Sequence, residues 1–338
     1  MNARSSDCHI GGLQRLSVVV PVFNEVDGLL ALQQRLLCAL SDLGMPFEIV
    51  YVDDGSTDGS LGILKRLHAS DARVCVLSFS RNFGKEAAMS AGLRRAKGDA
   101  VVVMDADLQH PPECIPQMVR AWQEHGADLV NMRRRSRSDE SRAKRLAARA
   151  FYRIINGLSD VPIPADVGDF RLLSRRAVDA LNQLEERNRF MKGLFAWIGF
   201  RQITLDFDVE ERFANQSKWR LRSLWKFAIE GLVAFSVAPL KLASYVGLLS
   251  AAGAFAYGLF FLVKALTLGD SVQGFPTLIV TILFLGGLQL LATGIVGEYL
   301  GRLFVESKRR PLYYVEEYLP SDDCVSQSMP VGYGRTSL

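Results

Sequence analysis

The sequence has few cysteines, no internal repeats and no apolar segment at its start. Its five cysteines are scattered, odd in number and without metal-site spacing, which argues against a disulfide framework or a cysteine-based metal centre and predicts reduced thiols. Residues 1–15 are polar and lack the apolar core of a signal peptide, so they give no indication of export. The absence of repeats and low-complexity segments excludes solenoid and fibrous architectures.

Charged residues are missing from two long segments. None occurs from Ala243 to Val263 or from Phe275 to Gly297. Each segment passes the roughly 20 residues that cross the apolar core of a bilayer, and buried core helices seldom stay uncharged for so long. We therefore expect two transmembrane helices, at about 242–264 and 275–299.

Basic residues gather on both sides of these segments, although the net charge of +4 is small. They are Lys218, Arg220, Arg222 and Lys226 on one side, and Arg302, Lys308, Arg309 and Arg310 on the other. The link between the two segments holds only Lys264 and Asp270. By the positive-inside rule, both ends of the chain are expected in the cytoplasm.

Strand and helix patterns alternate through the first part of the chain. Apolar or β-branched runs predict strands at 16–22, 47–52, 74–79, 100–103 and 128–132, and helical spacing predicts helices between them. This alternation predicts a three-layer α/β domain with a mostly parallel sheet. We assign 1–15 to a polar extension, 16–216 to this domain, 217–240 to a juxtamembrane amphipathic helix, 241–303 to the two transmembrane helices and 304–338 to a C-terminal tail.

Asp105 and Asp107 follow the fourth predicted strand, at the edge where ligands collect in open α/β sheets. Side chains alternate along a strand, so the two carboxylates are expected on one side, with Ala106 pointing away. Two such groups repel unless a cation lies between them, and Mg²⁺ or Mn²⁺ with oxygen ligands, together with a diphosphate, fits that need. The alternative is that one Asp caps the following helix and the other is solvated.

Seven motifs occur along the chain in a fixed order. They are Pro21-Val22-Phe23-Asn24-Glu25, Val52-Asp53-Asp54-Gly55-Ser56, Arg81-Asn82-Phe83-Gly84-Lys85, Asp105-Ala106-Asp107-Leu108-Gln109-His110-Pro111, Asp166-Val167-Gly168-Asp169-Phe170-Arg171, Asn188-Arg189-Phe190-Met191-Lys192-Gly193 and Arg212-Phe213-Ala214-Asn215-Gln216-Ser217-Lys218-Trp219. In this order they resemble the motifs of family 2 glycosyltransferases. With two C-terminal membrane helices, the chain resembles the GtrB-like polyprenyl-phosphate glycosyltransferases (bactoprenol glucosyl transferases), relatives of dolichol-phosphate mannose synthase.

The resemblance implies a Rossmann-like GT-A fold and a metal-dependent hexosyltransferase. Such an enzyme moves a hexose, glucose from UDP-glucose above all, onto undecaprenyl or another polyprenyl phosphate with inversion. Other donors (GDP-mannose, UDP-N-acetylhexosamine or a UDP-amino sugar) and a catalytically inactive nucleotide-sugar-binding scaffold are the alternatives. The resemblance also implies a multi-pass protein of the bacterial inner membrane with a cytoplasmic catalytic domain, and a role in envelope glycan synthesis such as O-antigen modification. A homo-oligomer, a flippase and a periplasmic glycosyltransferase are further partners it suggests; nucleic acid is not.

The resemblance also carries residue roles. Nucleotide-sugar binding falls to Pro21, Phe23, Glu25, Val52, Asp54, Lys85, Asp105, Ala106, Asp107 and Gln109, with Asp105, Asp107 and Gln109 at the metal. Acceptor or phosphate binding falls to Arg133, Arg171, Arg212 and Lys218. For Asp54, a helix or turn cap is an equal alternative.

Asp169 and Asp107 are the expected catalytic residues. Asp169 occupies the position to which the family assigns a base, but a phosphate monoester has a second pKa near ~6 and is largely ionised at pH 7. We therefore expect Asp169 mainly to orient the acceptor or Arg171, with a structural Asp169–Arg171 pair as the alternative.

Residues 217–237 repeat apolar side chains at helical spacing, with Arg222, Lys226 and Glu230 on the other side. This pattern predicts a helix in the lipid headgroup region, and an ordinary amphipathic helix packed on the catalytic domain is the alternative. A processive polysaccharide synthase would carry a Gln-x-x-Arg-Trp-type element and more membrane helices, and the sequence contains neither.

Overall fold

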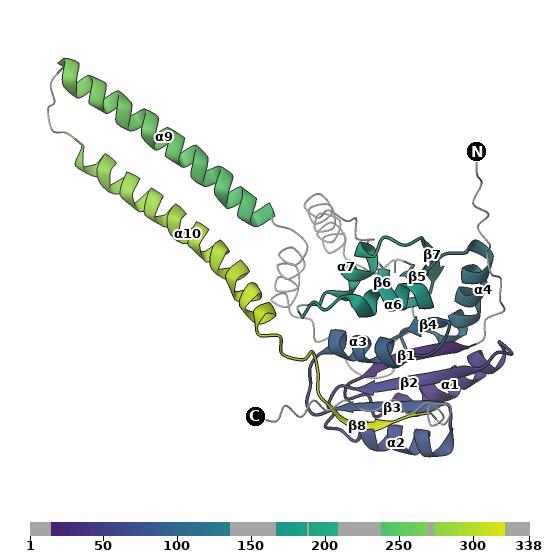
Figure 1. Cartoon of the computed structure of the whole chain (residues 1–338). Coiled ribbons are helices and arrows are strands. Elements are labelled where there is room, and N and C mark those ends of the chain that lie inside the picture. Colours follow the sequence, from purple (N-terminus) through teal and green to yellow (C-terminus); the bar gives the residue numbers. More distant parts are fainter. Residues whose placement is uncertain (1–14, 136–166, 188, 209–237, 269–273, 322–338) are drawn as a thin grey trace, which may run out of the picture. The chain divides into compact units, whose positions relative to one another are not determined.

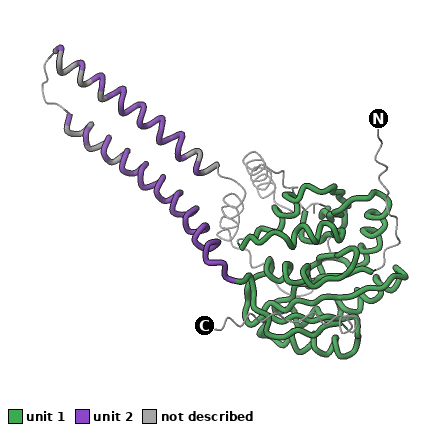
Figure 2. The backbone as a smooth tube through the Cα atoms, in the orientation of Figure 1, with its two compact units in different colours: residues 1–149, 163–218, 311–338 green, residues 150–162, 219–310 purple. Residues whose placement is uncertain are grey.

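The structure is a computed structural model that describes residues 15–135, 167–187, 189–208, 238–268 and 274–321. The chain divides into two compact units (Figure 2). Unit 1 comprises Met1–Arg149, Ile163–Lys218 and Pro311–Leu338, and unit 2 comprises Ala150–Pro162 and Trp219–Arg310. The predicted juxtamembrane helix at 217–240 lies almost wholly outside the described residues.

Unit 1 is built on an eight-stranded sheet with the order β7-β5-β6-β4-β1-β2-β3-β8 (Figure 1). The strands are β1 (Leu16–Val22), β2 (Phe47–Asp53), β3 (Val74–Phe79), β4 (Ala100–Val103), β5 (Leu129–Arg134), β6 (Val167–Ser174), β7 (Gln202–Phe207) and β8 (Val315–Leu319). All run parallel except β6, between β4 and β5, and β8, beside β3. The predicted mostly parallel α/β fold is therefore confirmed.

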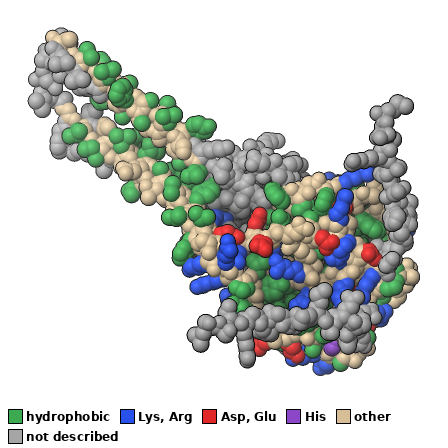
Figure 3. Space-filling view, in the orientation of Figure 1, with side chains coloured by type: hydrophobic (Ala, Val, Ile, Leu, Met, Phe, Trp, Pro, Cys, Tyr) green, Lys and Arg blue, Asp and Glu red, His purple; other side chains and the backbone are tan. Residues whose placement is uncertain are grey.

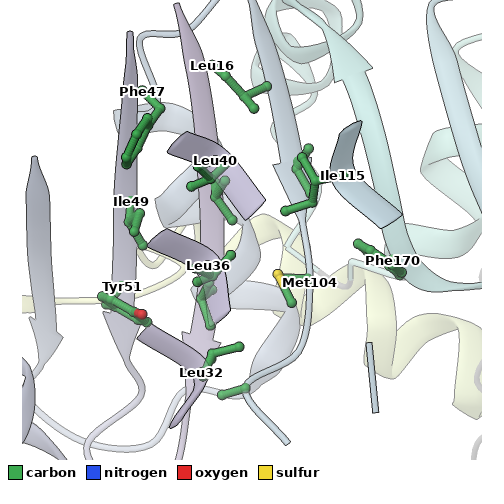
Figure 4. Packing of buried hydrophobic residues seen from close by; sticks show 14 of the residues in the cluster. Leu16, Leu32, Leu36, Leu40, Phe47, Ile49, Tyr51, Met104, Ile115 and Phe170 are labelled. Atoms are coloured by element: carbon green, nitrogen blue, oxygen red, sulfur yellow. The ribbon is translucent and has the colours of Figure 1, made fainter. Parts of the chain in front are cut away.

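Helices cover both faces of this sheet (Figure 1). The helices of unit 1 are α1 (Leu29–Ser41), α2 (Ser60–Ser70), α3 (Lys85–Arg95), α4 (Ile115–His125, preceded by a 3₁₀ turn at Pro112–Cys114), α6 (Arg175–Gln183) and α7 (Met191–Trp197). Leu16, Val18 and Val20 of β1 pack in one core with Leu32, Leu36 and Leu40 of α1 (Figure 4). Successive side chains of a strand point to opposite faces, so Val19 faces α3. There a Cβ on Gly92 would stand 2.2 Å from Val19 Cγ1, so glycine lets α3 approach the sheet closely.

Three strands of the sheet were not expected from the sequence. Strands β6 and β7 carry polar residues among apolar ones, and β8, with the sequence Val-Glu-Glu-Tyr-Leu, has no apolar run. The assignment of 304–338 to a tail is therefore wrong for Val315–Leu319, which pair with β3. Just before β8, the Tyr313 ring stacks on Phe79 of β3 at 4.8 Å and holds this segment on the sheet.

Unit 2 contains two long helices, α9 (Ala238–Leu268) and α10 (Phe275–Ser307), which lie side by side (Figure 1). Many of their described side chains are large, apolar and exposed, including Leu249 and Leu290 (Figure 3). By length and composition, one described stretch, Phe284–Ser307, could cross a membrane, and the apolar stretch Ala243–Tyr257 is shorter. Two transmembrane helices remain a prediction.

Candidate active site

Most of the predicted site residues that the structure describes lie where the parallel strands of unit 1 end. The loops after β1, β2, β3 and β4 leave the carboxyl ends of adjacent strands and share one edge of the sheet. Strand β6 runs antiparallel to β4, with Arg171 opposite Val103, so its amino end reaches the same edge. This reversal brings Asp169 to the loop that carries Asp105.

Lys85 joins two carboxylates that the sequence assigned to the site, Asp105 and Asp169. Its Nζ atom lies 2.5 Å from Asp105 Oδ1 and 2.6 Å from Asp169 Oδ2. Lys85 is the first residue of α3, directly after Gly84, whose φ of 98° suits glycine. Burial disfavours the charge on Lys85, but the two carboxylates outweigh it and hold the pKa of Lys85 above its ordinary value. The ammonium therefore stays charged and balances both acids.

Asp169 is a strongly stabilised carboxylate. Burial works against its charge, but Lys85, Lys192 and Arg171 lower the pKa of Asp169 to about 2. Its hydrogen-bond donor is Lys85 Nζ, while Arg171 Nη2 donates to the Gly168 carbonyl at 2.6 Å. Asp169 therefore pairs with Lys85, not with Arg171. A carboxylate with so low a pKa is a weak proton acceptor near neutral pH.

Asp105 and Asp107 lie in a loop, because β4 ends at Val103. Strand alternation therefore does not set their directions; Ala106 is buried while Asp105 and Asp107 are partly exposed, and a shared side for the two carboxylates stays a prediction. The loop is held by its own contacts: the Asp105 amide donates to His110 Nδ1 at 3.0 Å, and the Gln109 amide donates to Asp107 Oδ1 at 3.1 Å. His110 is buried and stacks on Phe170 with ring centres 5.0 Å apart. The loop presents Asp105 on a fixed support.

The predicted metal ligands suit a hard divalent cation by type. Asp105, Asp107 and Gln109 offer side-chain oxygens on one short loop, and the Lys85 ammonium shows that this loop attracts positive charge. Within the described residues, no three His, Cys, Asp or Glu side chains lie close enough together to hold a metal by themselves. A metal here therefore remains a prediction, and a bound diphosphate would have to supply further oxygens.

Asp54 serves the architecture of the site. Its oxygens accept hydrogen bonds from the amides of Phe83 at 2.7 Å and Gly84 at 2.9 Å, which ties the loop after β2 to the start of α3. Burial raises the pKa of Asp54, and these two amides oppose the rise. Gly55 makes this contact possible, because a Cβ there would stand 2.5 Å from the Arg81 carbonyl carbon. Asp54 thus acts as a cap for the turn before α3. Its role in nucleotide binding stays a prediction.

The remaining predicted nucleotide residues are spread along the same edge. Phe23 is 44% exposed, Pro21 and Glu25 are partly buried, and Val52 and Ala106 are buried. The Glu25 amide donates to Ser60 Oγ at 3.0 Å, which links the loops after β1 and β2. The structure therefore brings these residues to one edge of the sheet, and nucleotide binding by them stays a prediction.

The predicted phosphate-binding residues divide into three groups. Arg171 is buried, with its guanidinium 3.8 Å from the centre of the Phe195 ring, and burial lowers its pKa to about 10. Arg133 is exposed and pairs with Asp206 through Nε at 2.7 Å. Arg212 and Lys218 lie outside the described residues. Only Arg171 is thus placed beside Asp169.

Sequence reasoning missed Glu86 and Lys192 as members of this cluster. Glu86 Oε2 accepts the Met191 amide at 3.2 Å and so joins α3 to the start of α7. Burial, together with the charge of Asp169, raises the pKa of Glu86 to about 7. Lys192 falls in the sixth motif and Glu86 directly follows the third, but the Glu86–Met191 contact spans 105 residues and no local pattern reveals it.

Comparison with known proteins places this chain in a family. The model of the family described as Glycosyl transferase family 2 matches residues 17–181. An uncharacterized glycosyltransferase of Synechocystis sp. is 47% identical over 90% of this chain and 97% of its own length. The bactoprenol glucosyl transferase of Shigella phage SfV is 43% identical over 89% of this chain and 98% of its own, and a prophage bactoprenol glucosyl transferase homolog of Escherichia coli is 42% identical with the same coverage.

Proposed function

Because this chain belongs to glycosyltransferase family 2 and is a glycosyltransferase, we propose that it transfers a hexose from a nucleotide diphosphate-sugar to a polyprenyl phosphate. The proposed acceptor rests on one observation. This chain is 42–43% identical to proteins named bactoprenol glucosyl transferase, over nearly their whole length. Asp105 at the edge of the sheet would hold a cation for the negatively charged donor, and Lys85 beside it would contact the donor's phosphates. By the same likeness, the sugar is glucose and the donor UDP-glucose.

Asp105, Asp107 and Gln109 would hold Mg²⁺ or Mn²⁺, which, when bound, neutralises charge on a leaving nucleotide diphosphate. Asp105 would then exchange its contact with Lys85 for the cation, and Lys85 would be released toward the phosphates. A long, flexible lysine suits this exchange, since its charge moves without any change of backbone.

The acceptor phosphate supplies the nucleophile in a single displacement that inverts the anomeric centre. Such a phosphate is largely ionised at pH 7, so it needs little help from a base. Asp169, with its pKa of about 2, fits an orienting role better than proton removal. Arg171 beside it supplies fixed positive charge, and Arg212 and Lys218 would contribute more from the segment before α9.

The membrane arrangement belongs to the proposal. Helices α9 and α10 would both cross the bilayer, with 217–240 at the interface, so that unit 1 meets the lipid phosphate at the cytoplasmic face. The basic residues that flank the two uncharged segments support this orientation.

The test offers membranes that contain the full chain a panel of radiolabelled nucleotide sugars with undecaprenyl phosphate, and follows label into the lipid. We expect transfer from UDP-glucose, loss of transfer on chelation, and recovery on adding Mg²⁺ or Mn²⁺. Label from another sugar alone would correct the donor. Transfer that persists after thorough chelation would remove the metal from the proposal, and no label from any sugar would reject the acceptor.

A further inference from the structure

A small cavity lies between β5, β6, β7 and α7, and its lining includes Arg171, two residues after Asp169 on β6. It is lined mainly by Asn131, Arg171, Lys192 and Gln202, with Phe195 as an apolar wall. Asn131 and Arg171 are register partners on neighbouring strands, so their side chains leave the same face of the sheet. Both are almost completely buried, with 1% and 3% of their surface exposed. The cavity has room for about one water molecule.

A one-way chain of hydrogen bonds fixes the direction of the Asn131 amide. The backbone carbonyl of Phe195 can only accept, so Gln202 must turn its Nε2 toward it, and the two atoms are 3.0 Å apart. Gln202 Oε1 then faces Asn131 and accepts from Nδ2, also at 3.0 Å. Asn131 Oδ1 is consequently turned away from Gln202. Reversing either amide would place two donors or two acceptors face to face, so the orientation follows from the chain itself.

Two buried polar atoms, each on a residue that lines this cavity, have no partner within the described part of the chain. They are Asn131 Oδ1, an acceptor, and Arg171 Nε, which carries a hydrogen to donate. Arg171 Nη2 donates to the Gly168 carbonyl, and the flat face of the guanidinium packs on the Phe195 ring. These two contacts fix the guanidinium, so it cannot turn to bring Nε to another acceptor. A buried polar group without a partner is costly, and two such groups on residues that line one cavity indicate a shared occupant.

The chemistry of the two atoms restricts that occupant. A simple anion would accept from Arg171 Nε but would have nothing to donate to Asn131 Oδ1. A metal or ammonium cation could not accept from Arg171 and would be repelled by Arg171 and Lys192. A hydroxyl-type group does both, because its oxygen accepts one hydrogen bond while its hydrogen is donated to another acceptor. We propose that this cavity binds one hydroxyl-type group, a water molecule or a sugar hydroxyl, that bridges Arg171 Nε to Asn131 Oδ1.

The bridge would act on the reaction through Arg171. Arg171 follows Asp169 by two residues on β6, and its charge helps keep Asp169 ionised. Asn131 would then be a positioning residue, holding Arg171 through the bridging group without touching the reacting atoms. This kinetic consequence rests on the proposed function, whereas the existence of the site does not.

Crystals of the full chain, grown without donor and with UDP-glucose and analysed to about 1.6 Å, test the site directly. We expect density within hydrogen-bond distance of both Arg171 Nε and Asn131 Oδ1. Density in the donor-free crystal identifies a resident water, and density present only with donor and continuous with the sugar identifies a sugar hydroxyl. Either result supports the proposal. No density in either crystal, or a direct bond between the two protein atoms, would overturn it.

Kinetics of Asn131→Leu test the consequence, because leucine has a similar size but no acceptor. We expect kcat for transfer to fall about tenfold, the effect of about one hydrogen bond. The donor KM stays unchanged if the occupant is water and rises if it is a sugar hydroxyl. The matched control is Asn182→Leu on α6, an amide that donates to the Leu93 carbonyl outside this cavity, and it should match the wild-type chain.

A variant Asn131→Leu with wild-type kcat and KM would remove the positioning role. If the wild-type chain transfers no sugar at all, the proposed function fails, while the crystallographic result for the cavity still stands.

Discussion

Two pairs of acidic residues stand at the same edge of the sheet and are satisfied in different ways. Asp53 and Asp54 accept hydrogen bonds mainly from backbone amides and from the Ser78 hydroxyl, all held by the fold. Asp105 and Asp169 share the ammonium of one lysine side chain. We call the first the structural pair, because its partners are fixed by the fold, and the second the exchangeable pair, because we propose that a ligand takes over the lysine contact. Carboxylates of equal charge at one edge of the sheet thus differ in their partners: backbone amides and a hydroxyl for one pair, a flexible lysine side chain for the other.

Asp105→Asn should have the largest effect on sugar transfer. It removes one carboxylate from the exchangeable pair and from the predicted metal site, so we expect transfer to fall about 10²–10³-fold. The unfolding temperature should change little, since no backbone amide loses its acceptor. Radiolabel transfer and thermal unfolding measure the two effects, with the exposed Asp179→Asn as control. A large loss of stability would place Asp105 in the structural pair instead.

Asp169→Asn separates two possible roles of the second acid of the exchangeable pair, orientation and proton removal. If Asp169 orients Arg171 and the acceptor, transfer should fall by about a hundredfold at most, and by a similar factor from pH 6 to pH 9. The pKa of about 2 implies that the wild-type carboxylate is ionised throughout that range. A variant whose rate is lost at pH 7 but recovers steeply with rising pH would identify a general base.

Asp54→Ala tests the structural pair. It leaves the amides of Phe83 and Gly84 without their acceptor, so we expect the free energy of unfolding to fall by about 1–3 kcal/mol. Asp54→Asn keeps one acceptor oxygen and should lose less. Chemical denaturation of the detergent-solubilised chain measures both. A variant of unchanged stability that no longer binds UDP would show that Asp54 serves the nucleotide.

Glu86→Gln tests the environment of a buried carboxyl that accepts a backbone amide and also lies in the field of Asp169. The folded pKa of about 7 exceeds the ordinary 4.5, so between these values the unfolded chain ionises first and folding loses stability as pH rises. Glutamine keeps an oxygen for the Met191 amide but cannot ionise. Its unfolding temperature, relative to wild type, should therefore improve from pH 5 to pH 8.

The control for this measurement is Glu113→Gln. Arg35 lowers the pKa of Glu113, so the substitution should become less favourable, not more, as pH rises through its ordinary value. Parallel pH profiles for the two variants would contradict the environment assigned to Glu86.

Arg133→Ala should have the smallest effect. Its pair with Asp206 is exposed, so stability should hardly change. If Arg133 also binds the acceptor phosphate, the acceptor KM should rise about tenfold, the loss of about one charge-assisted hydrogen bond. Arg135→Ala, which breaks an exposed pair with Asp208, is the matched control. Equal acceptor KM values for the two variants would leave Arg133 without a role in phosphate binding.

The sequence allowed the parallel half of the fold to be predicted closely. Strands β1 and β3 have the predicted bounds, because short, nearly continuous apolar runs are typical of buried parallel strands. Strand β6 was missed because Gly168, Asp169 and Arg171 interrupt its apolar pattern. The sequence predicted the site residues one at a time, but the Lys85–Asp169 contact joins residues 84 positions apart and follows only from the reversed direction of β6.

Strand β8 means that the sheet of unit 1 is completed by residues made after both long helices. During synthesis, the outer side of β3 stays unpaired until Val315–Leu319 have left the ribosome. A shortened chain that stops before α9 would keep every acid of the site but would expose the backbone donors and acceptors of β3, which invites strand-to-strand association between copies. A soluble catalytic fragment should therefore carry residues 311–321 rejoined by a linker, rather than end at the first helix.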